Sequence, residues 1–353
     1  MTSRLIVHIG LPKTGSTAVQ AFLAENCEHL DEAGYGWLPG SRGANFSELA
    51  VAFSTVDNPT TRRYLRRDQD RRRWRDRIAR RLVRARDDHP QVIISSEHLA
   101  AQLRTPAETR ALADFLQPLV DEVMIIGVVR RADYWLPSDY AEAIRSGRDI
   151  KQGPGFVQRR SHLLDHDSLI GRWTGAFGTG NVRLLPFLEA DKSDPAAAPI
   201  RCLEAAGLPQ AVTTSWNRPA QLSRVGLSAE AAETLRRINP QLGLGSWHTG
   251  ADRARLVALL ADRHPGRGVA LTPAAHSALD RRGWIQTGIE LATVAHGDRW
   301  TEWVAEPAAP IRRPVQLDAP AVDATLEVVR AAGFGDPHPI SRRLRRGLQR
   351  LRH

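Results

Sequence analysis

The segment Gly10–Thr17 reads Gly-Leu-Pro-Lys-Thr-Gly-Ser-Thr, and it constrains the fold of this chain more than any other stretch. It follows a short apolar run over residues 5–9 and precedes a helical pattern over residues 18–24. A strand, a glycine-bearing loop and a helix in this order direct backbone N–H groups and a helix N-terminus at a bound phosphate. The sequence therefore predicts an anion-binding loop directly after the first strand.

This loop is close to the Walker A motif but departs from it at one position. Gly10 and Gly15 keep the required spacing, yet Ser16 stands where the motif has its lysine, and the lysine lies earlier, at Lys13. A nucleoside triphosphatase needs that lysine on the β- and γ-phosphates and a hydroxyl on Mg²⁺. A lysine placed before the second glycine suits a shorter anion at the 5′ end of a nucleotide.

A second polar cluster follows the nearly uninterrupted apolar run over residues 123–129, which predicts a parallel strand covered on both faces. The run ends at Arg130, and Ser138 follows eight residues later. Arginine offers a planar, charge-assisted donor fork, and serine adds a hydroxyl donor, so the pair suits a phosphate. Two alternatives stay open: Arg130 as a surface arginine at a strand end, and Ser138 as a helix cap.

Together, the two segments resemble the bacterial branch of the sulfotransferases that use 3′-phosphoadenosine 5′-phosphosulfate (PAPS). The resemblance covers residues 4–210 well and the remainder loosely. It implies a transferase that moves a sulfuryl group from PAPS to a hydroxyl of a carbohydrate, glycolipid or secondary metabolite, without a metal. It also implies that Arg130 and Ser138 clamp the 3′-phosphate of PAPS. The residues it assigns to the 5′-phosphosulfate are Pro12, Lys13, Thr14, Gly15, Ser16 and Thr17.

Sulfuryl transfer to a hydroxyl needs a group that takes the acceptor proton and a cation on the leaving oxygen. Glu97 ends a second predicted strand, over residues 91–97, and is the candidate base; Lys13 is the candidate cation. The sequence around Glu97 also resembles a segment of bacterial sulfotransferases. His98 is the competing base, and Glu97 has the alternative of capping a helix or pairing with an arginine. His8, inside the first strand, is interpreted as a core or supporting residue.

Alternation of strands and helices predicts an α/β fold with three layers, a mostly parallel central sheet and a P-loop-like phosphosulfate-binding loop. Ligands of such sheets bind at the carboxyl ends of the strands, where the loop, Glu97 and Arg130 all fall. We expect a sulfotransferase domain over residues 1–305, followed by a proline-containing linker and basic tail over residues 306–353. Further strands and helices are expected at 4–10, 16–27, 62–86, 106–116, 181–187, 196–206 and 228–238.

The charge of the chain favours anionic partners but comes almost entirely from arginine. The formal net charge is +10, with 46 arginines and 3 lysines, a bias typical of a GC-rich bacterium. Within residues 62–86 aspartates alternate with arginines, so we expect self-pairing there and no nucleic-acid binding. Cys27 and Cys202 fit no metal spacing, and no apolar stretch is long enough to span a membrane, so we expect a cytoplasmic protein.

The last residues, Ile340–His353, form a candidate basic amphipathic helix that would make weak contact with a membrane surface, or else a solvated helix. Two other functions stay open for the whole chain: a P-loop nucleotide kinase, and a non-enzymatic, arginine-rich protein that binds nucleic acid or membranes. The partner implied by the sulfotransferase interpretation is a small-molecule or glycan acceptor.

Overall fold

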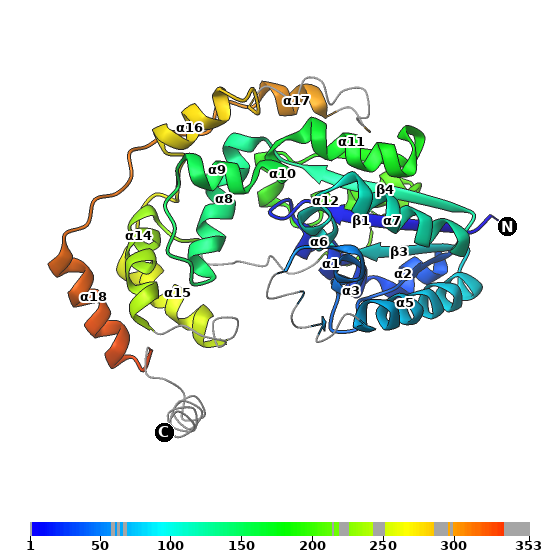
Figure 1. Ribbon diagram of the computed structural model, residues 1–353, viewed down its shortest axis with the longest axis horizontal. Helices are drawn as coiled ribbons and strands as arrows, with labels where there is room; N and C mark the ends of the chain where they lie inside the picture. Colours follow the sequence, from blue (N-terminus) through cyan, green and yellow to red (C-terminus); the bar gives the residue numbers. More distant parts are fainter. Residues whose placement is uncertain are drawn as a thin grey trace. The chain divides into compact units, whose positions relative to one another are not determined.

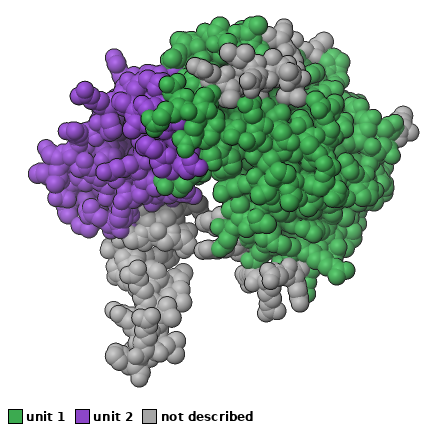
Figure 2. Space-filling model, turned by 45° about the horizontal axis from the view of Figure 1, so that its top comes forward, with its two compact units in different colours: residues 1–135, 159–222, 279–308 green, residues 136–158, 223–278, 309–353 purple. Residues whose placement is uncertain are grey.

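The computed structural model describes residues 2–57, 61, 64–65, 69–213, 215–218, 226–242, 251–285, 296 and 299–334. The chain divides into two compact units. Unit 1 takes residues 1–135, 159–222 and 279–308, and unit 2 takes residues 136–158, 223–278 and 309–353 (Figure 2). The chain thus enters unit 2 three times. The domain division expected at residue 305 stays a prediction.

Unit 1 is built on one sheet of five parallel strands, in the order β2-β3-β1-β4-β5 (Figure 1). β1, which leads into the glycine-bearing loop, lies in the middle, between β3 and β4. Each central strand is apolar on both faces, as expected for a parallel sheet that helices cover on both sides. The strands are β1 Arg4–Gly10, β2 Tyr35–Trp37, β3 Gln91–Ser95, β4 Glu122–Val129 and β5 Val182–Pro186.

Helices cover both faces of this sheet. On one face, Ile6 and Ile126 of the sheet pack with Phe22 of α1 (Ser16–Glu25) and Leu203 of α12 (Ala197–Ala206). α2 (Cys27–Glu32) lies beside β2. The other layer includes α5 (Gln69–Asp88) against β3, α11 (His166–Phe177) against β4, and α7 (Pro106–Leu116) packed on α11. The predicted α/β fold with three layers and a parallel sheet is confirmed.

Helix ends follow the local sequence. Thr105 caps α7 in a reciprocal capping box with Glu108, and Gly207 ends α12 in the left-handed conformation. Asn26 interrupts the helix expected over residues 16–27 and separates α1 from α2. The short strand β2 and the helix α3 (Ser47–Phe53) lie between the helices expected at 16–27 and 62–86, where the sequence predicted no regular element.

The other regular elements are short or belong wholly or partly to unit 2. They are α6 Glu97–Gln102, η1 Gln117–Leu119, α8 Ala132–Arg145, α9 Pro154–Arg159, α10 Ser161–Leu164, η2 Thr179–Asn181, η3 Glu189–Ser193, α13 Gln210–Thr213, α14 Ala229–Ile238, η4 Asn239–Leu242, α15 Ala251–Arg263, α16 Pro273–Asp280, α17 Trp300–Ala305 and α18 Ala319–Ala331. Of the two cysteines, Cys202 is buried and Cys27 is exposed, and both are free thiols.

Unit 2 is helical and has its own apolar core. α14 packs against α15 and α18, and Leu235, Leu256 and Leu326 of these helices are buried. Residues 312–318 run without regular structure, but α18 then forms inside the segment expected to be a linker. The predicted tail helix, Ile340–His353, lies outside the described residues. Within the described part of the chain, no helix has the length and apolar character needed to cross a bilayer.

Candidate active site at the carboxyl edge of the sheet

The loop between β1 and α1 is held tightly at its first residue. Gly10 has φ 80°, and a Cβ atom added there would lie 2.7 Å from the Cβ of Glu97. A side chain at position 10 therefore collides with the start of α6, so glycine is needed for both conformation and space. The amide of Leu11 then donates to the carbonyl of Val128 at 2.9 Å, which ties the loop to β4.

Lys13 has a left-handed backbone, with φ 67°, and no other non-glycine residue of the described chain has a positive φ. This conformation costs an ordinary residue about 1–2 kcal/mol. The loop is fixed on both sides of Lys13, because the Trp135 indole donates to the Pro12 carbonyl at 2.7 Å and the Thr14 hydroxyl donates to the Leu11 carbonyl at 2.6 Å. A strained residue that its surroundings hold in place is a reason to look for function at that residue.

The loop offers backbone donors more than hydroxyls. Ser16 is buried, and its hydroxyl donates to the Leu11 carbonyl at 3.0 Å, so it is already used inside the loop. Thr17 is exposed in the first turn of α1. The amides of Gly15, Ser16 and Thr17 make no hydrogen bond to any acceptor in the described part of the chain. These are the unsatisfied donors of a helix N-terminus, which suit an anion.

Glu97 opens α6 directly beside the loop, one residue beyond the Ser96 that follows β3. Its Oε2 accepts from the Gln20 amide at 2.8 Å and from the Asn45 amide at 2.7 Å. Both donors are neutral, so among the hydrogen bonds of the described chain Glu97 has no arginine partner. The alternative in which Glu97 pairs with an arginine does not occur there.

Buried polar side chains connect the Gln20 partner of this carboxylate to Ser95 and His8. Gln20 also reaches the Ser95 hydroxyl at 3.4 Å, and His8 Nδ1 lies 2.8 Å from the same hydroxyl. His8 is 2% exposed, and burial lowers its pKa to about 4, so its ring is neutral at pH 7. The interpretation of His8 as a core residue that supports the site agrees with this placement.

His98 follows Glu97 on α6 but is engaged differently. Its Nδ1 lies 2.9 Å from the Gln102 amide nitrogen, one turn further along the helix. Burial lowers the pKa of His98, and the neighbouring Glu97 partly offsets this. Successive helix residues point about 100° apart. Glu97 and His98 are therefore directed to different surroundings, and only Glu97 shares its hydrogen bonds with α1.

Arg130 lies at the end of β4, on the other side of the loop, and is only 4% exposed. Its Nη1 is 3.4 Å from the Lys13 carbonyl oxygen, so the sheet brings the two together. Its guanidinium also pairs with Glu189, through Nε at 2.7 Å and Nη2 at 2.6 Å. The alternative of an exposed surface arginine is wrong. Glu189 was missed by the sequence analysis.

Ser138 lies inside α8, which begins at Ala132, so it is not the cap of that helix. The two members of the predicted 3′-phosphate clamp belong to different units, Arg130 to unit 1 and Ser138 to unit 2. Their joint role stays a prediction. Among the described residues, no cluster of three or more histidine, cysteine, aspartate or glutamate side chains is arranged to hold a metal ion.

No protein-family model matches the chain, and no curated protein matches it. Among solved structures, a sulfotransferase from Alicyclobacillus acidocaldarius is similar, with a TM-score of 0.38 and 14% identity over 60% of this chain and 82% of that one. A sulfotransferase domain from the curacin biosynthetic pathway has a TM-score of 0.35 and 10% identity, over 80% and 98% of the two chains. Likeness this weak bears on neither the donor nor the acceptor.

Proposed function

We propose that this protein is a PAPS-dependent sulfotransferase that transfers a sulfuryl group to an acceptor hydroxyl. The observation that carries the proposal is the juxtaposition of the strained loop of Lys13 with Glu97. The loop lies directly against Glu97, and among the described residues this carboxylate has no cationic hydrogen-bond partner. This is the pair of functions that sulfuryl transfer requires: a site for the anionic donor and a group that accepts a proton.

The donor supplies the sulfuryl group on its 5′-phosphate. The residues that would hold this end are Pro12, Lys13, Thr14, Gly15, Ser16 and Thr17. The amides of Gly15, Ser16 and Thr17, which have no acceptor among the described residues, fit an anion. The hydroxyls of Thr14 and Ser16 shape the loop by bonding Leu11, so we assign these two residues a role through the backbone.

In the reaction, Glu97 takes the proton of the acceptor hydroxyl while the hydroxyl oxygen forms its bond to sulfur. The bond between sulfur and the bridging oxygen breaks, and its electron pair stays on the 5′-phosphate of the leaving adenosine 3′,5′-bisphosphate. Lys13 stabilises the negative charge on that bridging oxygen. The neutral amides of Gln20 and Asn45 orient Glu97 without removing its charge.

Arg130 would hold the 3′-phosphate, and the role of Ser138 as a second donor stays a prediction. Since Arg130 is paired with Glu189, a 3′-phosphate competes with this carboxylate for the guanidinium. We expect a hydroxyl of a carbohydrate, glycolipid or secondary metabolite as the acceptor, and reaction in the cytoplasm, where PAPS is made.

Two measurements on the full-length protein test the proposal. Calorimetry should show tighter binding of adenosine 3′,5′-bisphosphate than of 5′-AMP, with no requirement for Mg²⁺. PAPS labelled in its sulfur should pass label to at least one member of a panel of sugar, glycolipid and phenolic hydroxyls. Tight binding of ATP only with Mg²⁺, together with phosphate transfer, would instead establish the nucleotide kinase.

A further inference from the structure

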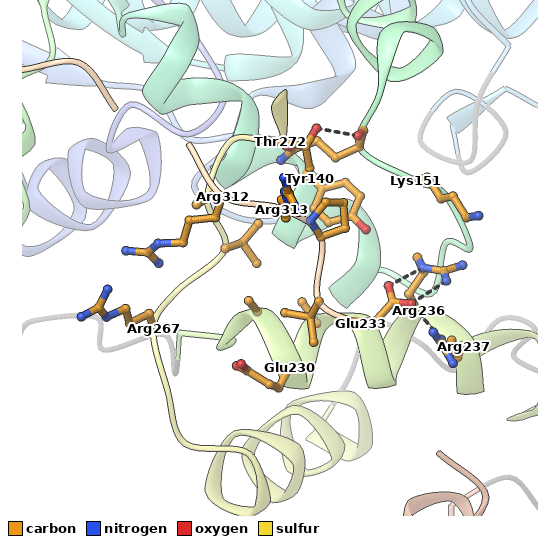
Figure 3. A pocket seen from close by; sticks show the side chains of 17 residues that line it. Tyr140, Lys151, Glu230, Glu233, Arg236, Arg237, Arg267, Thr272, Arg312 and Arg313 are labelled. Atoms are coloured by element: carbon orange, nitrogen blue, oxygen red, sulfur yellow. Dashed lines mark hydrogen bonds and ion pairs between the residues drawn. The ribbon is translucent and has the colours of Figure 1, made fainter. Parts of the chain in front are cut away.

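Unit 2 contains a cavity of about 520 Å³ that is built entirely from its own residues (Figure 3). This size is within the range of pockets for small molecules. Its walls come from α8, α14, the turn before α16 and the extended segment that precedes α18. The proposed reaction uses none of these wall residues.

The wall of the cavity is strongly basic. Six cationic side chains line it against two carboxylates, Glu230 and Glu233. The cations are Lys151, Arg236, Arg237, Arg267, Arg312 and Arg313. A concave surface with this excess of positive charge concentrates anions.

Only some of these cations are already neutralised. Arg236 bonds to Glu233 and Asp149, and Arg237 bonds to Glu233 and to the Leu317 carbonyl. Both carboxylates raise the pKa of Arg236. Arg236, Arg237 and Glu233 therefore stabilise the wall of the pocket through their own ion pairs.

The remaining cations are available. In the described part of the chain, Lys151, Arg267 and Arg313 make no side-chain hydrogen bond or ion pair, and Arg312 makes one bond, at 3.4 Å, to the Gly268 carbonyl. Figure 3 shows the side chains of Arg267 and Arg312 extending on the same side of the pocket, away from the Arg236 and Glu233 pair. An anion placed there gains charge-assisted bonds without breaking an internal ion pair.

A buried donor also lines the cavity without a partner. Gln152 is 8% exposed, its Oε1 accepts from the Thr272 amide at 2.6 Å, and its Nε2 is buried with no hydrogen-bond partner among the described residues. Native structures rarely leave such a group unpaired. This nitrogen is closed to solvent, so a ligand oxygen in the pocket satisfies it only when the Gln152 side chain turns toward the cavity. The nearby hydroxyl of Tyr140 stays protonated at neutral pH, because burial raises its pKa to about 12.

The rest of the wall is apolar: Ala229, Ala232, Val269, Ala270, Pro314 and Val315. Two carboxylates in the wall are unfavourable for an anion. Glu233 is paired with Arg236 and Arg237, and Glu230 is not paired with either of them. The Oε2 of Glu230 lies 3.0 Å from the place that a Cβ of Gly266 would take, against the turn after α15. The carboxylate is thus packed on that turn.

We propose that this cavity is a binding site for a small amphiphilic anion. Its carboxylate, sulfate or phosphate group bonds to Arg267 and Arg312, which extend on the same side of the pocket, and its apolar body lies on the alanine, valine and proline wall. This site is independent of the proposed sulfotransferase reaction.

The test is calorimetry on the full-length protein with probes that share one body: hexyl sulfate, hexyl phosphate and hexanoate, against hexanol and hexylammonium. We expect the anions to bind about tenfold or more tightly than the neutral and cationic probes, since one charge-assisted bond accounts for about a factor of ten. The order among the three anions identifies the preferred head group. Inorganic sulfate that binds as well as hexyl sulfate, or hexylammonium that binds as well as the anions, overturns the proposal.

Variants locate the site. The double variant Arg312→Ser, Arg313→Ser and the single variant Gln152→Glu should each weaken hexyl sulfate binding about tenfold. Arg267→Ser removes an exposed side chain and should weaken hexyl sulfate binding as well, so it tests the site even if the double variant does not fold. Arg330→Ser, at an exposed position of α18, is the matched control and should bind as the wild type does. Lys13→Gly should also leave hexyl sulfate binding unchanged. Loss of hexyl sulfate binding in Lys13→Gly would place the probe at the loop and refute the assignment. Unchanged binding in both Arg267→Ser and Gln152→Glu would refute it as well.

Discussion

Two charged side chains flank the loop, Glu97 and Arg130, and they differ in the charge of their hydrogen-bond partners. On the β3 side, the Oε2 of Glu97 accepts hydrogen bonds from two neutral amides, those of Gln20 and Asn45. On the β4 side, Arg130 is buried and bonded to the carboxylate of Glu189. Neutral donors orient a charge and leave it available, whereas an opposite charge cancels it. Among the described residues, the Oε2 of Glu97 thus has no cationic hydrogen-bond partner, whereas Arg130 has an anionic one. If the proposed function holds, Glu97 can accept a proton without losing an ion pair, and Arg130 must exchange a partner before it binds a phosphate.

The largest effect is expected at the available charge. Glu97→Gln should lower sulfuryl transfer by about a hundredfold to ten-thousandfold, because glutamine keeps the shape of the side chain but does not accept the proton. Binding of adenosine 3′,5′-bisphosphate should stay within about twofold of the wild type. Transfer rates with labelled PAPS and calorimetry measure the two quantities.

Glu327→Gln, at an exposed position of α18, serves as the control for loss of a carboxylate. His98→Asn tests the competing base. If His98→Asn abolishes transfer and Glu97→Gln remains active, the assignment of the base is reversed.

The next effect concerns Lys13. Lys13→Gly should lower transfer by about a hundredfold or more, since one charge-assisted contact to the leaving oxygen is lost. Its free energy of unfolding should change by less than about 1 kcal/mol, because glycine adopts the left-handed backbone without strain. Lys13→Arg, which keeps a cation, should recover part of the rate. A folded Lys13→Gly protein with the wild-type rate removes Lys13 from the mechanism.

Much of the fold followed from the sequence because its strands are continuous apolar runs and its loop has a glycine pattern. The partners of the site did not, since they are distant in the chain. Glu189 meets Arg130 across 59 residues, and Asn45 meets Glu97 across 52. No periodicity links such pairs. The sequence also missed α18, since prolines that break a helix interior are tolerated in its first turn.

Acid should lower the free energy of unfolding through His8, which lies in β1 against the Ser95 hydroxyl of β3. The pKa of His8 falls from 6.5 to about 4 on folding, so below pH 6.5 the unfolded chain binds a proton that the folded chain refuses. Stability should therefore fall as the pH drops from 6.5 towards 4, by about 1.4 kcal/mol per pH unit for this group. His162 and His166, with pKa values of about 3 and about 4, act in the same direction. Urea unfolding of His8→Asn should show a shallower pH dependence; an unchanged slope contradicts the assignment.

On the β4 side, Glu189→Gln separates the ion pair of Arg130 with Glu189 from its proposed binding of the 3′-phosphate. Without the opposing carboxylate the guanidinium is free for a 3′-phosphate, so affinity for adenosine 3′,5′-bisphosphate should rise about tenfold while affinity for 5′-AMP stays unchanged. The same change should lower stability by about 1–3 kcal/mol, because a buried charge loses its partner. Calorimetry and denaturant unfolding follow the two changes. Equal gains for both nucleotides would mean that Arg130 does not read the 3′-phosphate.

The smallest effect is expected at an exposed counterpart of the Arg130 pair. Arg218 bonds to Asp194 at 3.0 Å, but both side chains are open to solvent, with exposed fractions of 50% and 43%. Water screens such a pair, and its contribution is about 0.5 kcal/mol. Arg218→Ala should therefore leave both stability and nucleotide affinity close to the wild type, in contrast to any change at Arg130. If Arg218→Ala weakens adenosine 3′,5′-bisphosphate binding as strongly as Arg130→Ala does, then the exposed arginine contributes as much to nucleotide binding as the buried one. The difference that we infer between the two ion pairs would then be wrong.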